Sequence, residues 1–152
     1  MKTKTYKISI SVPASKAYNL MLGLDNKKTY EDWTALFNPT STYEGSWDKG
    51  SKMMFVGTDE QGKKGGMIAV IAENIPNKFI SIKHYGILEN GLEILDGPKV
   101  EGWTGSLENY TFSETNGVTA ITVEVDANEE YINYFDEAWP KALNKLKELS
   151  EL

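Results

Sequence analysis

The chain has 152 residues, a formal net charge of −6 and no cysteine. This length suits one domain with a substantial core, so residues 1–152 are expected to form a single domain. The negative charge argues against nucleic acid as a partner, because phosphate groups bind to basic patches. The absence of cysteine excludes disulfides, a thiol nucleophile and thiolate metal ligands.

No apolar run approaches the roughly 20 residues that cross a bilayer, which argues against membrane insertion. The polar start MKTKTYK lacks the apolar segment of a signal peptide. We therefore expect a cytoplasmic protein.

The first predicted element is a strand that ends before Pro13. Its apolar residues alternate with polar ones, which is typical of a strand with one buried face. These apolar residues are Tyr6, Ile8, Ile10 and Val12. Two short helices are predicted next. The first is expected to be capped by Ser15 and to end at Gly23, and the second spans residues 30–37, before Asn38 and Pro39.

A series of strands follows. Residues 41–47 and 52–57 are predicted to form a hairpin, and residues 66–75 and 78–86 form the next two strands. Residues 86–105 hold five glycines and only short apolar pieces, so we expect a long loop with one short strand.

The strongest turn signal in the sequence is Asn116-Gly117, which lies between LENYTFSE and VTAITVEV. Both central positions of the favoured two-residue hairpin turn need a positive φ, and asparagine and glycine tolerate it. These two segments are therefore predicted to pair as a hairpin.

The last element is a long helix capped by Asp126 or Asn128. Its apolar residues recur at spacings of three and four, which predicts a buried face. They are Ile132, Phe135, Trp139, Leu143, Leu146 and Leu149. Pro140 lies within this helix, and a proline there removes a hydrogen bond and clashes with the preceding turn. We expect a kink that lets the carboxyl half pack on the sheet while the amino half covers its other end.

This order of elements predicts an α+β fold. We expect a curved antiparallel sheet of six or seven strands wrapped around the kinked terminal helix, with two short helices after the first strand. A strongly curved sheet around one helix encloses more space than side chains usually fill, so a cavity is expected between them.

Several segments resemble the START-like, helix-grip (SRPBCC) superfamily, and the resemblance covers nearly the whole chain. They are YKISISVPASKAYNLML, GSWDKGSKM, GGMIAVIAENIPNKFISIKHYG, ENYTFSETNGVTAITVEVD and YFDEAWPKALNKLKELSE. Within the superfamily, the chain is similar to domains related to the carboxyl-terminal part of the activator of heat-shock protein 90 ATPase, which are grouped with polyketide cyclases and birch-pollen-allergen-like proteins. The resemblance implies a helix-grip fold with an apolar cavity. No counterpart of that activator's amino-terminal chaperone-binding domain is present, which argues against a chaperone partner.

His84 is the only histidine, and it alternates with Ile80 and Ile82 on one face of a predicted strand. If that face is inward, its imidazole is a candidate general base; the alternative is a hydrogen-bonded wall residue. The sequence has no GxSxG, HExxH, GxxxxGKS/T or GxGxxG motif, so serine hydrolase, zinc protease and nucleotide-binding functions lack their characteristic residues. Neither a metal site nor a cofactor is expected.

Large aromatic side chains are numerous, and 4 tryptophans offer contact area and polar groups to an amphipathic ligand. Methionine adds a flexible apolar lining. The alternative is that these side chains only fill the core. The predicted ligand-binding residues are Trp33, Phe55, Met67, His84, Trp103, Tyr110, Phe135 and Trp139.

The leading hypothesis is the binding of a small hydrophobic molecule, which is aromatic, polyketide-like or lipid-like, beneath the terminal helix. The ligand is expected to enter near residues 86–105. Two alternatives stay open: a cyclase-like or hydrolase-like enzyme that uses His84 with a nearby tyrosine or carboxylate, and a protein-interaction module related to chaperone activation.

Overall fold

The computed structural model describes residues 1–152, which form one antiparallel sheet and three helices. Alternating apolar residues and tight turns build the sheet. The eight strands are β1 (Lys2–Ile10), β2 (Thr42–Gly45), β3 (Lys52–Thr58), β4 (Lys64–Ile75), β5 (Phe79–Glu89), β6 (Leu92–Ile94), β7 (Leu107–Thr115) and β8 (Val118–Ala127). Their order is β1-β8-β7-β5-β4-β3-β2, and β6 pairs with β5 outside this path. The α+β fold is confirmed. The sheet has eight strands where six or seven were expected, and the short β6 is the additional one.

Two turns of the same type shape the sheet. Asn116-Gly117 joins β7 to β8 as predicted, with φ angles of 52° and 79°. Asn90-Gly91 joins β5 to β6 in the same way, with φ angles of 53° and 79°. The predicted loop at residues 86–105 is therefore wrong in its first part, because β5 continues through Gly86 to Glu89.

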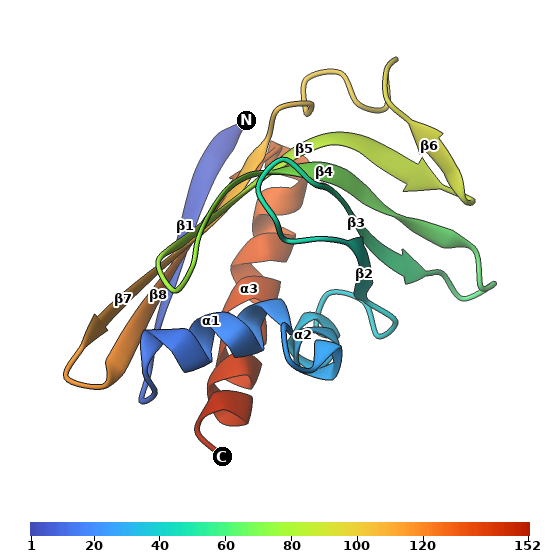
Figure 1. Cartoon of the computed structure of the whole chain (residues 1–152). Helices are drawn as coiled ribbons and strands as arrows, with labels where there is room; N and C mark the ends of the chain where they lie inside the picture. Colours follow the sequence, from blue (N-terminus) through green and yellow to red (C-terminus); the bar gives the residue numbers. More distant parts are fainter.

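The sheet is curved, and irregular pairing between β4 and β5 contributes to the curvature. The register shifts between Ile68 and Ala69 and again between Ile71 and Glu73. Bulges of this kind bend a strand and increase its twist. Figure 1 shows the result, in which the sheet arches around the terminal helix α3 (Glu129–Ser150).

Two short helices, α1 (Ala14–Leu22) and α2 (Lys27–Thr34), follow β1 as predicted, but their ends differ from the prediction. Ser15 lies inside α1, and Pro13 takes the N-cap position. Helix α2 begins at Lys27 because the Asn26 side chain accepts the Lys28 N–H at 3.0 Å. Both helices pack against α3.

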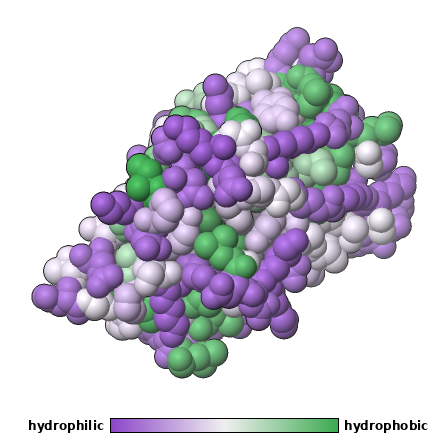
Figure 2. All heavy atoms as spheres, in the orientation of Figure 1, coloured by the Kyte–Doolittle hydropathy of each residue, from purple (hydrophilic) through white to green (hydrophobic).

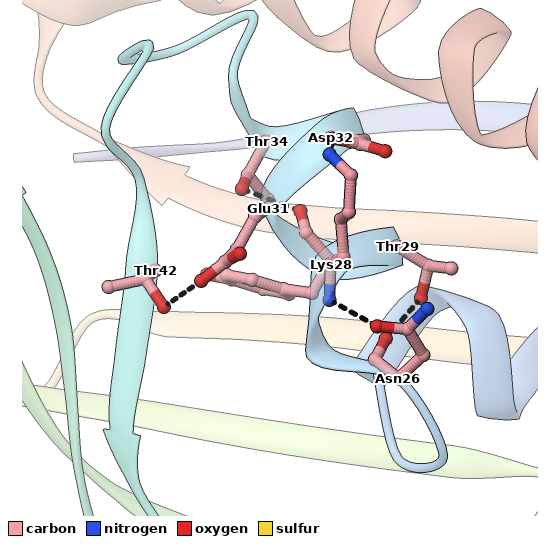
Figure 3. A network of polar contacts seen from close by, with 8 residues as sticks. Asn26, Lys28, Thr29, Glu31, Asp32, Thr34 and Thr42 are labelled. Carbon is pink, nitrogen blue, oxygen red and sulfur yellow. Dashed lines mark hydrogen bonds and ion pairs between the residues drawn. The ribbon is translucent and has the colours of Figure 1, made fainter.

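Polar contacts hold α2 against β2, as Figure 3 shows. The Thr42 hydroxyl donates to the Glu31 carboxylate at 2.7 Å, which joins the strand to the helix. Lys28 and Asp32 form an ion pair at 2.9 Å on the outer surface of the helix. The opposite face of α2 is buried and consists of Tyr30, Trp33 and Thr34.

Helix α3 is continuous through Pro140. Pro140 is exposed, and because it has no N–H, the Asp136 carbonyl lacks its usual helical donor. A kink at this position stays a prediction. Asn128 takes the N-cap position without a side-chain hydrogen bond, whereas Asp126 accepts hydrogen bonds from Thr3 and from the backbone of Leu107.

Burial divides α3 into two halves. In the carboxyl half, Leu143 and Leu146 are buried and belong to the hydrophobic core with β1, β8 and α1. In the amino half, Ile132 and Phe135 are only half-buried. The predicted apolar face is therefore fully buried only from Trp139 to Leu146, and Leu149 at its end is half-buried. The amino half covers a space that the core does not fill.

Candidate functional site

A cavity of about 780 Å³ lies between the concave face of the sheet, α2 and the amino half of α3. Small-molecule pockets typically enclose roughly 300–1,000 Å³, so this volume suits a ligand of ordinary size. All the residues predicted to bind a ligand line it, namely Trp33, Phe55, Met67, His84, Trp103, Tyr110, Phe135 and Trp139. The structure thus brings residues from seven parts of the sequence, far apart along the chain, to one place.

Three glycines in β3 and β4 leave part of the cavity wall without side chains. In the pairing of these strands, Val56 lies opposite Gly66 and Gly57 lies opposite Gly65. A Cβ atom on Gly66 would overlap the Phe55 carbonyl oxygen, so the close approach of the two strands requires glycine there. Backbone, rather than side chains, forms this part of the wall.

Aromatic rings form the wall beneath α3, with Trp139 at their centre. Its ring centroid lies 5.0 Å from that of Phe37, 5.9 Å from Trp33 and 6.2 Å from Tyr110. Trp33 and Trp139 are almost fully buried, so they belong to the core and to the cavity wall at once. The expectation that aromatic residues fill the core is confirmed for these two, and their contact with a ligand stays a prediction.

Trp47 is the one tryptophan that does not line the cavity. It is buried in the core and donates its indole N–H to the Leu22 carbonyl at 3.1 Å. It therefore has a structural position only.

His84 lies in the sheet wall and is 4% exposed. It shares the inward face of β5 with Ile80 and Ile82, as predicted. Its Nε2 atom is 3.2 Å from a carboxylate oxygen of Glu108 on β7. The Trp103 ring stacks on the imidazole with the centroids 5.6 Å apart. The other ring nitrogen, Nδ1, is buried and has no hydrogen-bond partner.

Glu108 is a polar residue of the cavity wall that the sequence did not single out. The Tyr110 hydroxyl donates to its second carboxylate oxygen, so His84, Glu108 and Tyr110 form one polar cluster in the wall. The alternation of residues along β7 could have predicted the position of Glu108. Glu108 precedes Tyr110 by two residues, so both lie on the same face of the strand. No third histidine, cysteine, aspartate or glutamate joins His84 and Glu108 in a metal-binding arrangement.

Tyr110 and Tyr30 of the wall are held in their protonated form. Burial raises the pKa of Tyr110 well above its usual value, and the negative charge of Glu108 raises it further. The same two causes raise the pKa of Tyr30. Tyr110 is therefore a hydrogen-bond donor to Glu108 at neutral pH.

The segment 95–106 closes one side of the cavity and carries Trp103. The His84 N–H donates to the Ser106 carbonyl at 2.9 Å, and the Gly105 N–H donates to the His84 carbonyl at 2.8 Å. Val100 is buried and anchors the middle of the segment. These contacts place Trp103 over the imidazole; the admission of a ligand near this segment stays a prediction.

Figure 2 shows hydrophobic residues scattered among hydrophilic ones on the face that it presents. Scattered exposed apolar residues are normal for a globular protein and do not indicate a binding site. None of the three helices combines the length and the apolar character that a membrane span requires.

A curved antiparallel sheet that grips a long terminal helix over a cavity defines the helix-grip class of proteins. No protein-family model matches the sequence, and no curated protein matches it. Solved structures do match. The Aha1 dimer from Colwellia psychrerythraea, determined in solution, has a TM-score of 0.71 and 19% sequence identity, with 100% of this chain and 98% of that chain covered.

Two further solved structures are similar. Protein MLL2253 from Mesorhizobium loti has a TM-score of 0.69 and 16% identity, with 97% of this chain and 96% of that chain covered. CalU16 from Micromonospora echinospora has a TM-score of 0.64 and 15% identity, with 97% of this chain and 75% of that chain covered. Identities this low establish the fold alone. The resemblance to the helix-grip superfamily is confirmed at that level.

Proposed function

We propose that this protein binds a small hydrophobic molecule in the cavity beneath α3. The observation that carries this proposal is the cavity itself, about 780 Å³ in volume and lined by aromatic rings from the sheet, α2 and α3. Aromatic side chains provide large apolar contact areas with fixed geometry. The half-buried Phe135 and the adjacent aromatic residues leave apolar surface that a ligand would remove from water.

A titration followed by nuclear magnetic resonance tests this proposal, with flavonoids, polyketides and fatty acids as the ligands. The indole N–H signals of Trp33, Trp103 and Trp139 are expected to shift, because all three residues line the cavity. The Trp47 signal is expected to stay in place, because Trp47 does not line the cavity. Trp47 therefore serves as an internal control within the same core.

Two results would count against the proposal. One is that no ligand of the panel shifts the three cavity tryptophans. The other is that all four indoles shift together, which indicates a general change of the core in place of binding at one site.

A second candidate function is proton transfer to or from a ligand, and the contact between His84 and Glu108 favours it. A carboxylate beside one ring nitrogen orients an imidazole and leaves the other nitrogen available as a base. Here Nδ1 is that second nitrogen, and it has no partner. The stacked Trp103 ring would have to move before a ligand reached it.

The substitution His84→Ala separates the two candidates. A binding protein is expected to keep its affinity for the panel ligands within a few-fold, since the imidazole supplies little of the apolar wall. An enzyme is expected to lose turnover of a bound ligand, measured by mass spectrometry of the products, while it still binds. Turnover in His84→Ala as fast as in the unsubstituted protein would exclude His84 as the base, since a general base contributes about 10²–10⁴-fold to the rate.

A further inference from the structure

Glu108 is a carboxylate of the cavity wall with most of its side chain covered. Its side chain is 18% exposed, and both of its oxygens already accept a hydrogen bond or lie within hydrogen-bond distance of a donor. A carboxylate has about four acceptor sites, so the contacts with His84 and Tyr110 leave about two of them free. The wall thus contains unused capacity to accept hydrogen bonds.

No buried positive charge compensates Glu108 except the imidazole of His84 when it is protonated. None of the buried residues of the chain is a lysine. The lysines at the rim of the cavity face solvent, and two of them have carboxylate partners there. Lys64 pairs with Glu44 at 2.6 Å, and Lys99 pairs with Glu89 at 2.6 Å.

The unpartnered atom of His84 points to the same kind of ligand. In the tautomer that donates its Nε2–H to Glu108, Nδ1 is an acceptor without a donor. Buried polar atoms in native proteins are normally satisfied, so this atom needs a donor. Glu108 and Nδ1 of His84 are therefore acceptors that the protein itself does not fully supply with donors.

Aromatic rings surround this acceptor group. Trp103 and Phe55 lie 5.6 Å and 6.1 Å from the imidazole of His84, and Trp139 lies 6.2 Å from the ring of Tyr110. A cation within about 6 Å of such rings is attracted by their negative faces. A carboxylate next to aromatic faces is an environment that suits an ammonium group and disfavours an anion.

We propose that the ligand of this cavity is a hydrophobic amine whose protonated nitrogen binds Glu108 among these rings. This inference rests on the proposed function, since it names the chemical class of the ligand at the same site. It selects against the fatty acids and other carboxylates that an apolar cavity would otherwise accept. The ammonium group donates hydrogen bonds to Glu108, and the apolar body fills the space beneath Trp139 and Phe135.

Three probes with the same apolar body test the proposal by isothermal titration calorimetry at neutral pH. They are naphthylmethylamine, naphthylmethanol and naphthylacetate, whose end groups are cationic, neutral and anionic. We expect the amine to bind at least about tenfold more tightly than the acetate, with the alcohol between them. Glu108→Gln is expected to reduce this ratio to about twofold, because glutamine keeps the shape of the side chain, loses its charge and replaces one accepting oxygen with a donating NH2 group.

Glu101→Gln is the matched control. Glu101 also lines the cavity and the substitution removes the same charge, but its side chain is exposed at the rim. The preference for the amine is expected to persist in this variant, because charges in solvent are screened. Retained binding of the alcohol by Glu108→Gln would show that the variant is folded.

The outcomes separate the inference from the function on which it rests. If none of the three probes binds to the unsubstituted protein, both are overturned. If the acetate binds as tightly as the amine, the inference is wrong while the proposed function stands. The inference is also wrong if Glu101→Gln reduces the preference as much as Glu108→Gln does, because the net charge of the protein would then explain it.

Discussion

Leu143→Ala is expected to lower the free energy of unfolding by about 2–5 kcal/mol, the usual cost of removing a buried leucine side chain from a core. Leu143 is 1% exposed in the carboxyl half of α3, where the helix packs on β1 and the core. Phe135→Ala, in the amino half, is expected to cost much less, because that side chain is only half-buried. Urea denaturation monitored by circular dichroism measures both values.

Ligand binding is expected to show the opposite order. Phe135 lines the cavity and Leu143 does not. Loss of the phenyl contact should weaken binding of a hydrophobic ligand by about 1 kcal/mol, or roughly fivefold in Kd. At temperatures where it is folded, Leu143→Ala should bind normally. Equal costs of the two substitutions in stability, or equal effects on binding, would contradict the division of α3 into an anchoring half and a covering half.

Gly66→Ala is expected to be the most damaging substitution in the cavity wall. The added methyl group would overlap the Phe55 carbonyl oxygen, and the φ angle of 153° is one that residues with a side chain rarely adopt. Overpacking and backbone strain each cost about 1–3 kcal/mol, so their sum is a large fraction of the stability of a small domain. Thermal unfolding of the variant measures the loss.

Gly65→Ala is the neighbouring control. A Cβ atom there would meet the Leu88 carbonyl oxygen at 3.4 Å, an ordinary van der Waals contact. We expect a change in stability below about 1 kcal/mol for this variant. If Gly65→Ala and Gly66→Ala prove equally stable, the close pairing of β3 and β4 does not depend on the missing side chain at Gly66.

The strands were predictable because a half-buried strand alternates polar and apolar residues. The face formed by Ile80, Ile82 and His84 illustrates this, as all three residues are buried. The ends of elements were less predictable, because local signals compete. Helix α2 begins after Asn26, because the side chain of Asn26 accepts the N–H of Lys28. Asn90-Gly91 forms a hairpin turn within residues 86–105, where the five glycines indicated a loop.

The candidate site was largely predictable from its aromatic residues, since large rings in a curved sheet around one helix have few other places to lie. Its chemistry was not. Glu108 becomes significant only when the pairing of β5 with β7 places it beside His84, and this pairing joins residues that are distant in the sequence. Pro140 was predicted to kink α3. The helix continues through it from Glu129 to Ser150, and a kink there stays a prediction.

The most direct test of the account is to locate a bound ligand of the panel by nuclear Overhauser effects between ligand and protein. We predict contacts from one ligand to Trp103 beside the sheet and to both Phe135 and Trp139 on α3, because these residues line the same cavity. Contacts confined to exposed side chains such as Leu92 or Leu24, with none to the cavity residues, would contradict it.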